Sequence, residues 1–250
     1  MVNELVIITG VTGFLGKAYV SQYANNRENR DTLQIVGISR VAPKIKNRFV
    51  KYCQIDLLDS KTTQSCIQNI DLSGIDKIVY IHPVGKFKFE SDFQELDSVV
   101  CSSNVDTFKN IAEPLINRIN QSKTKLCLVA FGSISDSFNV PFWRSYSYSK
   151  NVLRKYVQQK VAENEQVSGC FFNLSSVRTE NESRLRPFAN TQYWLSPEEI
   201  VTRSVNRISF DSNWSEFDIF NAAPNYSSDL YSNHVELLAR WEKEMSGKSS

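Results

Sequence analysis

The sequence predicts an α/β protein with a doubly wound parallel sheet of about seven strands and helices on both faces. Three observations predict this fold. Short apolar runs alternate along the chain with longer segments of helical character. The apolar runs are continuous, which is typical of parallel strands that are buried on both faces. A glycine-rich turn joins the first apolar run to the first helical segment.

The predicted strands and helices follow one another in a regular order. We expect strands at Leu5–Thr9, Leu33–Ile38, Tyr52–Asp56, Lys77–Ile81, Lys125–Phe131, Gly169–Leu174 and Phe217–Asn221. We expect helices at Phe14–Asn25, Lys61–Asn69, Leu96–Asn120, Tyr146–Glu163, Pro197–Phe210 and Asp229–Met245. Right-handed crossovers then bring the carboxyl ends of all strands to one edge of the sheet, where ligands bind. The polar segment Glu180–Gln192 is expected to be irregular, either a mobile lid or a plain surface loop.

Length and composition indicate an ordinary globular protein. The chain has 250 residues, of which 41% are hydrophobic and 22% charged, and its net charge is +2. We therefore expect one domain over residues 1–250, without nucleic-acid or membrane partners. Five scattered cysteines without metal-ligand spacing indicate free thiols and no metal site. The apolar opening Leu5–Thr9 is too short for a secretory signal, so we expect a cytoplasmic protein.

The glycine-rich turn has the features of a dinucleotide-binding Rossmann turn. Its glycines stand at positions 10, 13 and 16. They permit a tight turn, a close approach of the backbone to a pyrophosphate, and close packing of helix against strand. The helix that follows directs its positive end at the phosphates. The residues expected to hold a cofactor here are Gly10, Thr12, Gly13, Phe14, Leu15 and Gly16.

The second predicted strand ends in a basic residue rather than an acidic one. A site for NAD places a carboxylate about 20 residues beyond the glycines, where it binds the ribose 2′-hydroxyl. This chain offers Ser39 and Arg40 instead, and a guanidinium can bind a 2′-phosphate through two hydrogen bonds. We therefore expect NADP(H) to be favoured over NAD(H).

Tyr146 and Lys150 lie four residues apart, which places both side chains on one face of a helix. An ammonium group beside a phenol favours the phenolate, so Lys150 is expected to lower the pKa of Tyr146. Such a tyrosine can donate or accept a proton near neutral pH. The pair follows the fifth predicted strand, whose end brings the hydroxyl of Ser133 to the same edge of the sheet.

Together these motifs resemble the short-chain dehydrogenase/reductase family. The matching residues are Thr9–Gly16, Asn104, Ser133, Tyr146 and Lys150, in the family's order. Ser133 precedes Tyr146 by 13 residues, which is the family's usual interval. The segment 104–107 resembles the motif of the family's fourth helix, and Asp56-Leu57 resembles its adenine-contacting site.

The resemblance implies a role for each matched residue. Tyr146 would be the general acid/base, and Lys150 would hold the nicotinamide ribose and lower the pKa of the tyrosine. Ser133 would orient and polarise the substrate carbonyl, and Asn104 would support Lys150 through a bound water. Hydride would pass between the nicotinamide and the substrate carbon. The family also implies a homodimer or homotetramer.

Two segments depart from the family's pattern. His82-Pro83-Val84-Gly85 stands in place of Asn-Asn-Ala-Gly; Pro83 and Gly85 should still line the cofactor, while His82 is either an extra catalytic group or a packing residue. After the sixth predicted strand, Ser175 and Ser176 replace Pro-Gly. Val177 and Thr179 then stand where contacts to the nicotinamide carboxamide are expected.

Three functions are consistent with these residues. The favoured one is an NADP(H)-dependent oxidoreductase that interconverts a carbonyl and an alcohol on a small molecule. A nucleotide-sugar epimerase, dehydratase or ketoreductase is the second, because the glycine spacing resembles the extended branch of the family; the chain after Lys150 is short for that branch. A non-catalytic NADP-binding relative is the third, and the two altered segments are its motivation.

Overall fold

The computed structural model describes residues 3–25, 32–88, 90, 95–137, 143–221 and 233–247. In this part of the chain, seven strands form one all-parallel sheet in the order β3-β2-β1-β4-β5-β6-β7. The strands are β1 (Glu4–Thr9), β2 (Leu33–Ser39), β3 (Val50–Gln54), β4 (Lys77–His82), β5 (Lys125–Ser133), β6 (Val167–Leu174) and β7 (Trp214–Ile219). The helices are α1 (Phe14–Asn25), α2 (Ser60–Gln68), α3 (Ser98–Ile119), α4 (Arg144–Glu163), α5 (Glu180–Leu185), α6 (Pro197–Val205) and α7 (His234–Ser246).

The predicted doubly wound Rossmann fold is confirmed. From β1 the chain first moves outward to β2 and β3, and it then returns to the other side of β1 to add β4 to β7. The order therefore reverses between β1 and β4, which creates a crevice at the carboxyl ends of these two strands.

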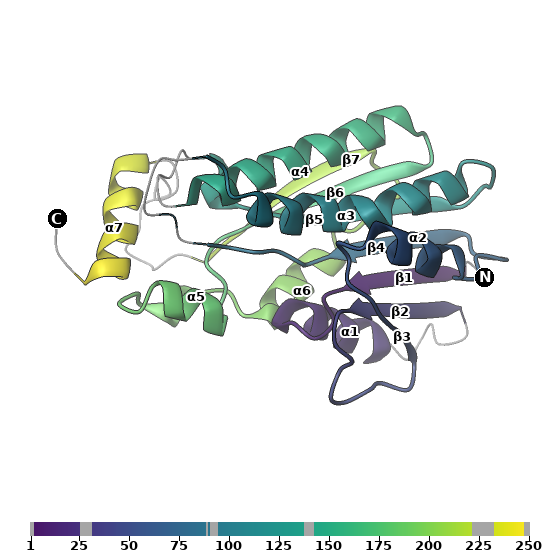
Figure 1. Cartoon of the computed structure of the whole chain (residues 1–250), viewed down its shortest axis with the longest axis horizontal. Helices are drawn as coiled ribbons and strands as arrows, with labels where there is room; N and C mark the ends of the chain where they lie inside the picture. Colours follow the sequence, from purple (N-terminus) through teal and green to yellow (C-terminus); the bar gives the residue numbers. More distant parts are fainter. Residues whose placement is uncertain are drawn as a thin grey trace.

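Both faces of the sheet are covered by helices, as the continuous apolar strands predicted (Figure 1). Alternate residues of each strand point to opposite faces. In β1, Leu5 and Ile7 pack with the core under α2, α3 and α4, whereas Val6 and Ile8 pack with the core under α1 and α6. The sheet is a rigid support for the side chains at its carboxyl edge.

Several element boundaries differ from the prediction. The helix predicted over Pro197–Phe210 ends at Val205, because Ile208 and Phe210 fold back to pack against the apolar core from outside the helix. The strand predicted at Tyr52–Asp56 is Val50–Gln54, since Asp56 is used in the turn that leads into α2. The part of Asp229–Met245 before residue 233 lies outside the described residues.

The segment Glu180–Gln192 is more regular than expected. Its first six residues form α5, and the Thr179 hydroxyl caps this helix by accepting the Glu182 backbone N–H at 3.2 Å. Helices α5 and α7 lie beyond the carboxyl ends of the strands, at the left of Figure 1. None of the helices in the described ranges is long and apolar enough to cross a membrane.

Candidate functional site

Two cavities lie side by side at the carboxyl edge of the sheet. One of about 230 Å³ is lined by Ser133, Tyr146 and Lys150, and the other, of about 470 Å³, is lined by residues that follow β1 and β2. Val84 and Gly85, which follow β4, belong to the walls of both cavities. The two cavities therefore meet at the crevice between β1 and β4, and together they form one elongated site.

The larger cavity contains most of the predicted adenine and phosphate contacts. The predicted residues in its wall are Gly10, Thr12, Ser39, Arg40, Asp56, Leu57 and Gly85. Arg40 is exposed, and Lys86 adds a second cation to the wall. The Ser39 hydroxyl donates to the Val41 carbonyl oxygen at 2.7 Å, so that its own oxygen can still accept a hydrogen bond.

The glycine turn is built for close approach of backbones. Gly10 has a φ of +62°, a left-handed conformation that side chains disfavour. A Cβ atom on Gly16 would lie 2.2 Å from the Gly10 carbonyl oxygen, which no side chain could tolerate. Gly13 donates its N–H to the Gly10 carbonyl at 2.8 Å, and Phe14 begins α1. Gly13, Phe14 and Gly16 shape the turn without lining either cavity, whereas Leu15 lines the smaller one.

The smaller cavity brings together three of the four predicted catalytic residues. Tyr146 and Lys150 come from α4, and the Lys150 Nζ lies 5.4 Å from the centroid of the Tyr146 ring. The Tyr146 side chain is hydrogen-bonded to that of Ser133, at the end of β5. Pro83, Gly85 and Val177 complete the predicted residues in this wall. A phenol, an ammonium and a hydroxyl thus face one small space.

The pKa of Tyr146 differs from the expectation. Burial raises the pKa of its phenol, the carboxylates of Glu182 and Asp136 raise it further, and only the hydrogen bond with Ser133 lowers it. Burial lowers the pKa of Lys150 to about 8, against the attraction of Asp136. The expected lowering of the tyrosine pKa by Lys150 is wrong for this structure, because burial and two carboxylates dominate. The phenol is therefore protonated at neutral pH.

Asn104, the fourth predicted catalytic residue, is fully buried behind the cavity rather than in its wall. Its amide accepts the Lys86 N–H at 2.6 Å, donates to the Lys86 carbonyl at 3.0 Å, and donates to the Ser149 hydroxyl at 2.8 Å. It thereby ties the segment after β4 to α3 and α4. A Cβ atom on Gly85 would lie 3.2 Å from Asn104 Oδ1 and 3.3 Å from Lys150 Nζ, so the glycine leaves room for both.

The segment after β6 forms one end of the smaller cavity. Ser175, Ser176 and Val177 line it, and the Ser175 hydroxyl is buried with no hydrogen-bond partner among the described residues. Such a group is suited to the carboxamide of a nicotinamide, which can both donate and accept. Thr179, which was also predicted to contact the carboxamide, lines neither cavity. It caps the N-terminus of α5 instead.

His82 is a packing residue of the core. It is 1% exposed at the end of β4 and lines neither cavity. Its Nδ1 lies 2.8 Å from the hydroxyls of both Thr9 and Tyr80, and its Nε2 lies 3.1 Å from the Thr107 hydroxyl. All hydrogen-bonding positions of a neutral imidazole are satisfied there.

Comparisons with known proteins show which fold this is. No family model matches the sequence, and no curated protein matches it. Among solved structures, a short chain dehydrogenase from Salmonella enterica serovar Typhi is 17% identical with a TM-score of 0.70, covering 87% of this chain and 96% of its own. The chain has the short-chain dehydrogenase fold.

Two further structures share this fold. A 4-hydroxyisoleucine dehydrogenase complexed with NADH is 20% identical with a TM-score of 0.67, covering 90% of this chain and 100% of its own. An alcohol dehydrogenase from the archaeon Thermococcus sibiricus, complexed with 5-hydroxy-NADP, is 18% identical with a TM-score of 0.66, covering 89% and 99%. The similarity extends over nearly the whole short-chain dehydrogenase fold.

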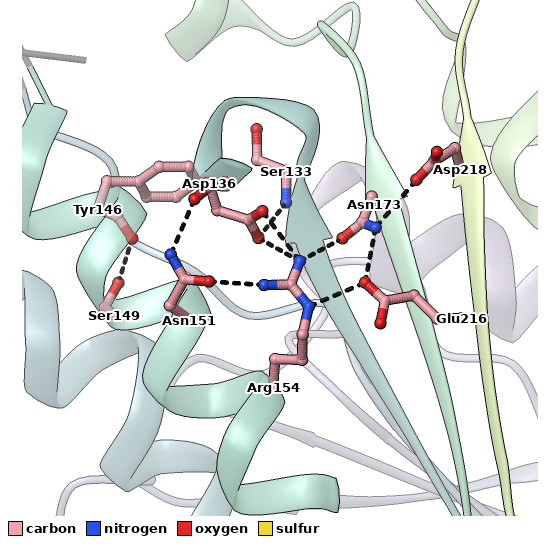
Figure 2. A network of polar contacts seen from close by, with 9 residues as sticks. All are labelled: Ser133, Asp136, Tyr146, Ser149, Asn151, Arg154, Asn173, Glu216 and Asp218. Atoms are coloured by element: carbon pink, nitrogen blue, oxygen red, sulfur yellow. Dashed lines mark hydrogen bonds and ion pairs between the residues drawn. The ribbon is translucent and has the colours of Figure 1, made fainter. Parts of the chain in front are cut away.

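Behind Ser133, this short-chain dehydrogenase fold contains a buried ionic network that the sequence did not reveal (Figure 2). The Asp136 carboxylate accepts two hydrogen bonds from Arg154 Nη2, at 2.9 and 2.8 Å, and it lies 3.4 Å from the Ser133 backbone nitrogen. Arg154 also donates to Asn173 and Glu216. The network fixes the turn that presents Ser133.

A second ionic cluster joins the two helices beyond the strand ends. Arg186 donates to Glu182 at 2.8 Å, to Glu244 of α7, and to the Ser176 hydroxyl. Glu182, Arg186 and Arg240 all line the smaller cavity of this short-chain dehydrogenase fold. The four-residue spacing of Glu182 and Arg186 is typical of an ion pair on a helix. The surrounding residues have too little apolar character for a helix to be predicted from the sequence.

Proposed function

We propose that this chain is an NADP(H)-dependent oxidoreductase that interconverts a carbonyl and an alcohol on a small molecule. The observation that carries the proposal is the meeting of Ser133, Tyr146 and Lys150 in a cavity that continues into the glycine-turn cavity through Val84 and Gly85. A dinucleotide is long enough to lie across both spaces, with its adenine end near Arg40 and its nicotinamide end near Ser175.

The residues of the site fit this chemistry. A bound nicotinamide supplies or accepts the hydride. Tyr146 holds a proton on its phenol oxygen and can give it to a carbonyl oxygen in the same cavity. Ser133, hydrogen-bonded to Tyr146, can bind the same carbonyl oxygen and orient it. Lys150 is held against Gly85 and can bind the ribose hydroxyls of the cofactor.

We further propose that the cofactor is NADP(H). The fold alone does not decide between the two cofactors, because one structural neighbour is complexed with NADH and another with NADP. The wall of the larger cavity carries the cations Arg40 and Lys86 beside the hydroxyl of Ser39. Among the described residues of this wall the one carboxylate is Asp56, which accepts the Leu58 backbone N–H at 3.1 Å. A 2′-phosphate would find charge-assisted donors there, whereas the carboxylate that follows β2 in an NAD site is missing.

The test of the proposed function uses Tyr146→Phe. We expect the parent to oxidise NADPH with members of a panel of ketones and aldehydes. The kcat of the variant should be about 10²- to 10⁴-fold lower, which is the usual contribution of a general acid to the rate. NADPH binding, followed by fluorescence, should be retained. Tyr148→Phe is the matched control, because Tyr148 is exposed on the same helix. Absence of turnover with every carbonyl, or equal rates in the two variants, would contradict the proposal.

The cofactor preference is tested with Arg40→Gln. Removing a charge-assisted contact of about 1.5–3 kcal/mol should weaken NADPH binding roughly 10- to 100-fold and leave NADH binding unchanged. Lys46→Gln removes the same charge from an exposed position outside the cavity, and it should have little effect. Equal losses for NADPH and NADH would show that Arg40 does not select the 2′-phosphate.

Two broader expectations accompany the function. All five cysteines are free, which suits a reducing compartment, and we propose a cytoplasmic location on that ground. The family resemblance implies a homodimer or homotetramer, which light scattering on the purified chain would test.

A further inference from the structure

We propose that the substrate of this site is an uncharged carbonyl compound with a neighbouring hydroxyl group, and that the Glu182 carboxylate binds this hydroxyl. This inference rests on the proposed function, because it names the substrate class of the smaller cavity. It assigns to the short helix α5 a part in substrate selection that neither the fold nor the catalytic residues require.

Glu182 is a carboxylate in the wall of the smaller cavity with one oxygen unengaged. The residue stands in the first turn of α5, and it shares the cavity wall with Tyr146. Its Oε1 accepts a hydrogen bond from Arg186 Nη1 at 2.8 Å, whereas its Oε2 has no partner among the described residues. The Glu182 side chain is 28% exposed. A molecule in the cavity can therefore reach the second oxygen.

Arg186 holds the Glu182 carboxylate in a fixed position. The Arg186 side chain is only 7% exposed, and it also donates to Glu244 and to the Ser176 hydroxyl. Its guanidinium lies over the Trp194 ring, 5.0 Å from the ring centroid. A carboxylate that is held in this way loses little freedom when a ligand binds, which favours both affinity and specificity.

The charges around the cavity are balanced. The described charged groups in its wall, and in the ion pairs around it, comprise as many cations as carboxylates. The cations are Lys150, Arg154, Arg186 and Arg240, and the carboxylates are Asp136, Glu182, Glu216 and Glu244. Asp136 lies beside the catalytic pair, where its charge raises the pKa of both Tyr146 and Lys150. A substrate with an acid or an amine would upset this balance, whereas a neutral substrate would preserve it.

A hydroxyl group is the neutral partner that suits the second oxygen of Glu182. An ionised carboxylate can only accept hydrogen bonds, so its partner must carry an O–H or N–H. Hydrogen bonds to a charged acceptor are roughly twice as strong as those between neutral groups. The negative charge of Glu182 also raises the pKa of the Tyr146 phenol, so the two groups act across the same space. The hydroxyl should therefore stand close to the carbonyl that Tyr146 would protonate.

Another part of the cavity wall is aromatic. Phe87 and Trp143 line it with their ring centroids 5.4 Å apart, and the Phe87 centroid lies 5.0 Å from that of Tyr146. Apolar walls with a few polar groups orient a ligand by its polar end. The site therefore favours a carbonyl compound with an apolar or aromatic part on one side and a hydroxyl on the other.

The experiment compares two aryl ketones of nearly the same shape on the full chain. The probes are α-hydroxyacetophenone and propiophenone, in which a methyl group stands in place of the hydroxyl. Their Kd values are measured by calorimetry in the presence of NADP⁺, which cannot reduce a ketone, and the absorbance of NADPH is followed to confirm that no turnover occurs. We expect the hydroxy ketone to bind at least about tenfold more tightly, equivalent to ~1.4 kcal/mol.

Two charged probes test the balance of charges. Benzoylformate carries a carboxylate next to the same aryl ketone, and α-aminoacetophenone carries an ammonium group there. Neither should bind more tightly than the hydroxy ketone, because each adds an uncompensated charge to the cavity.

Three variants assign the preference to Glu182. Glu182→Met keeps the length of the side chain but removes both oxygens, so it should bring the two ketones to equal Kd values by weakening the hydroxy ketone. Glu182→Asp keeps the carboxylate on a shorter side chain and should keep part of the preference. Glu180→Met is the matched control, because Glu180 is exposed on the same helix outside the cavity wall, and it should keep the full preference. Thermal unfolding of each variant reports whether the fold is retained.

The outcomes separate this inference from the proposed function. Equal binding of the two ketones to the parent, tighter binding of either charged probe, or an unchanged preference in Glu182→Met would overturn the role of Glu182. If the preference is found and lost as expected while the parent reduces no ketone with NADPH, the oxidoreductase function fails and the hydroxyl site stands. If the parent reduces both ketones but binds them equally, the function stands and the hydroxyl site fails.

Discussion

Protonation of His82 should limit the stability of this protein in acid. Thr107 Oγ1 donates to the Ser103 carbonyl at 2.7 Å, so it can only accept from His82. This assigns the proton of the neutral ring to Nε2 and leaves Nδ1 to accept from the hydroxyls of Tyr80 and Thr9. If Nδ1 were also protonated, the ring would carry a buried positive charge among groups that already satisfy the hydrogen bonds of the neutral ring.

The size of the effect follows from the pKa of the ring. Burial, and to a smaller extent the positive charge of Lys150, lower the pKa of His82 from 6.5 to about 3. Above the ordinary pKa both the folded and the unfolded chain are neutral at this residue, so the stability contribution is complete. Below the ordinary pKa, the unfolded chain binds a proton at this histidine, whereas the folded chain does not. The free energy of unfolding should then fall by ~1.4 kcal/mol per pH unit, and by about 5 kcal/mol once the folded ring is protonated.

The assay is urea unfolding of the parent and of His82→Asn between about pH 7 and about pH 4. The variant should be less stable at neutral pH, because it loses packing and hydrogen bonds. Its stability should nevertheless depend less steeply on pH, by roughly one proton per molecule. Carboxylates titrate in both proteins, so their contribution cancels in the comparison.

A matched control comes from the second histidine of the chain. His234 is the first residue of α7, and this helix lies beyond the carboxyl ends of the strands (Figure 1). The variant His234→Gln should keep the steep pH dependence of the parent. Parallel stability curves for the parent and His82→Asn would refute the reasoning, because they would mean that His82 binds its proton equally well in the folded and unfolded chain.

Two further predictions concern positions around the catalytic residues. Gly85→Ala should lower kcat by about tenfold with little change in thermal stability, since the new methyl group would displace Lys150 and Asn104 by a few tenths of an ångström; an unchanged kcat in steady-state assays would contradict this. Arg154→Gln should lower the free energy of urea unfolding by about 3–5 kcal/mol, because it leaves the fully buried Asp136 carboxylate without its ion pair. Adding Asp136→Asn to that variant should recover part of the loss, and a single variant as stable as the parent would show that the ion pair contributes nothing.

The fold was predictable from the sequence because its signals are local. The central strands β1 and β5 each contain a continuous apolar run, and the glycine turn follows β1 directly. Tyr146 and Lys150 are likewise carried by one helix, and a single spacing identifies them. The ends of elements were less predictable: Ile208 and Phe210 fit a helical pattern, yet they reach the core after the helix has ended.

The ionic networks were hidden because their members are far apart in the chain. Asp136, Arg154 and Glu216 come from a short turn, a helix and an edge strand, and no period or motif connects them. Each alone looks like an ordinary surface charge. Their burial is decided by how β5, β6, β7 and α4 pack, which a single sequence does not reveal.

The same limit explains the pKa of Tyr146. Reasoning from one neighbour, Lys150, gave a lowered pKa, whereas the structure adds burial and two carboxylates that raise it. The consequence is chemical: a phenol that keeps its proton is ready to give it to a carbonyl oxygen, whereas oxidation of an alcohol needs the phenolate as a base. An oxidised nicotinamide carries a positive charge, and placing it in the smaller cavity would favour that phenolate. A reduced nicotinamide ring is neutral, so in the same place it would leave the phenol protonated, as reduction of a carbonyl requires.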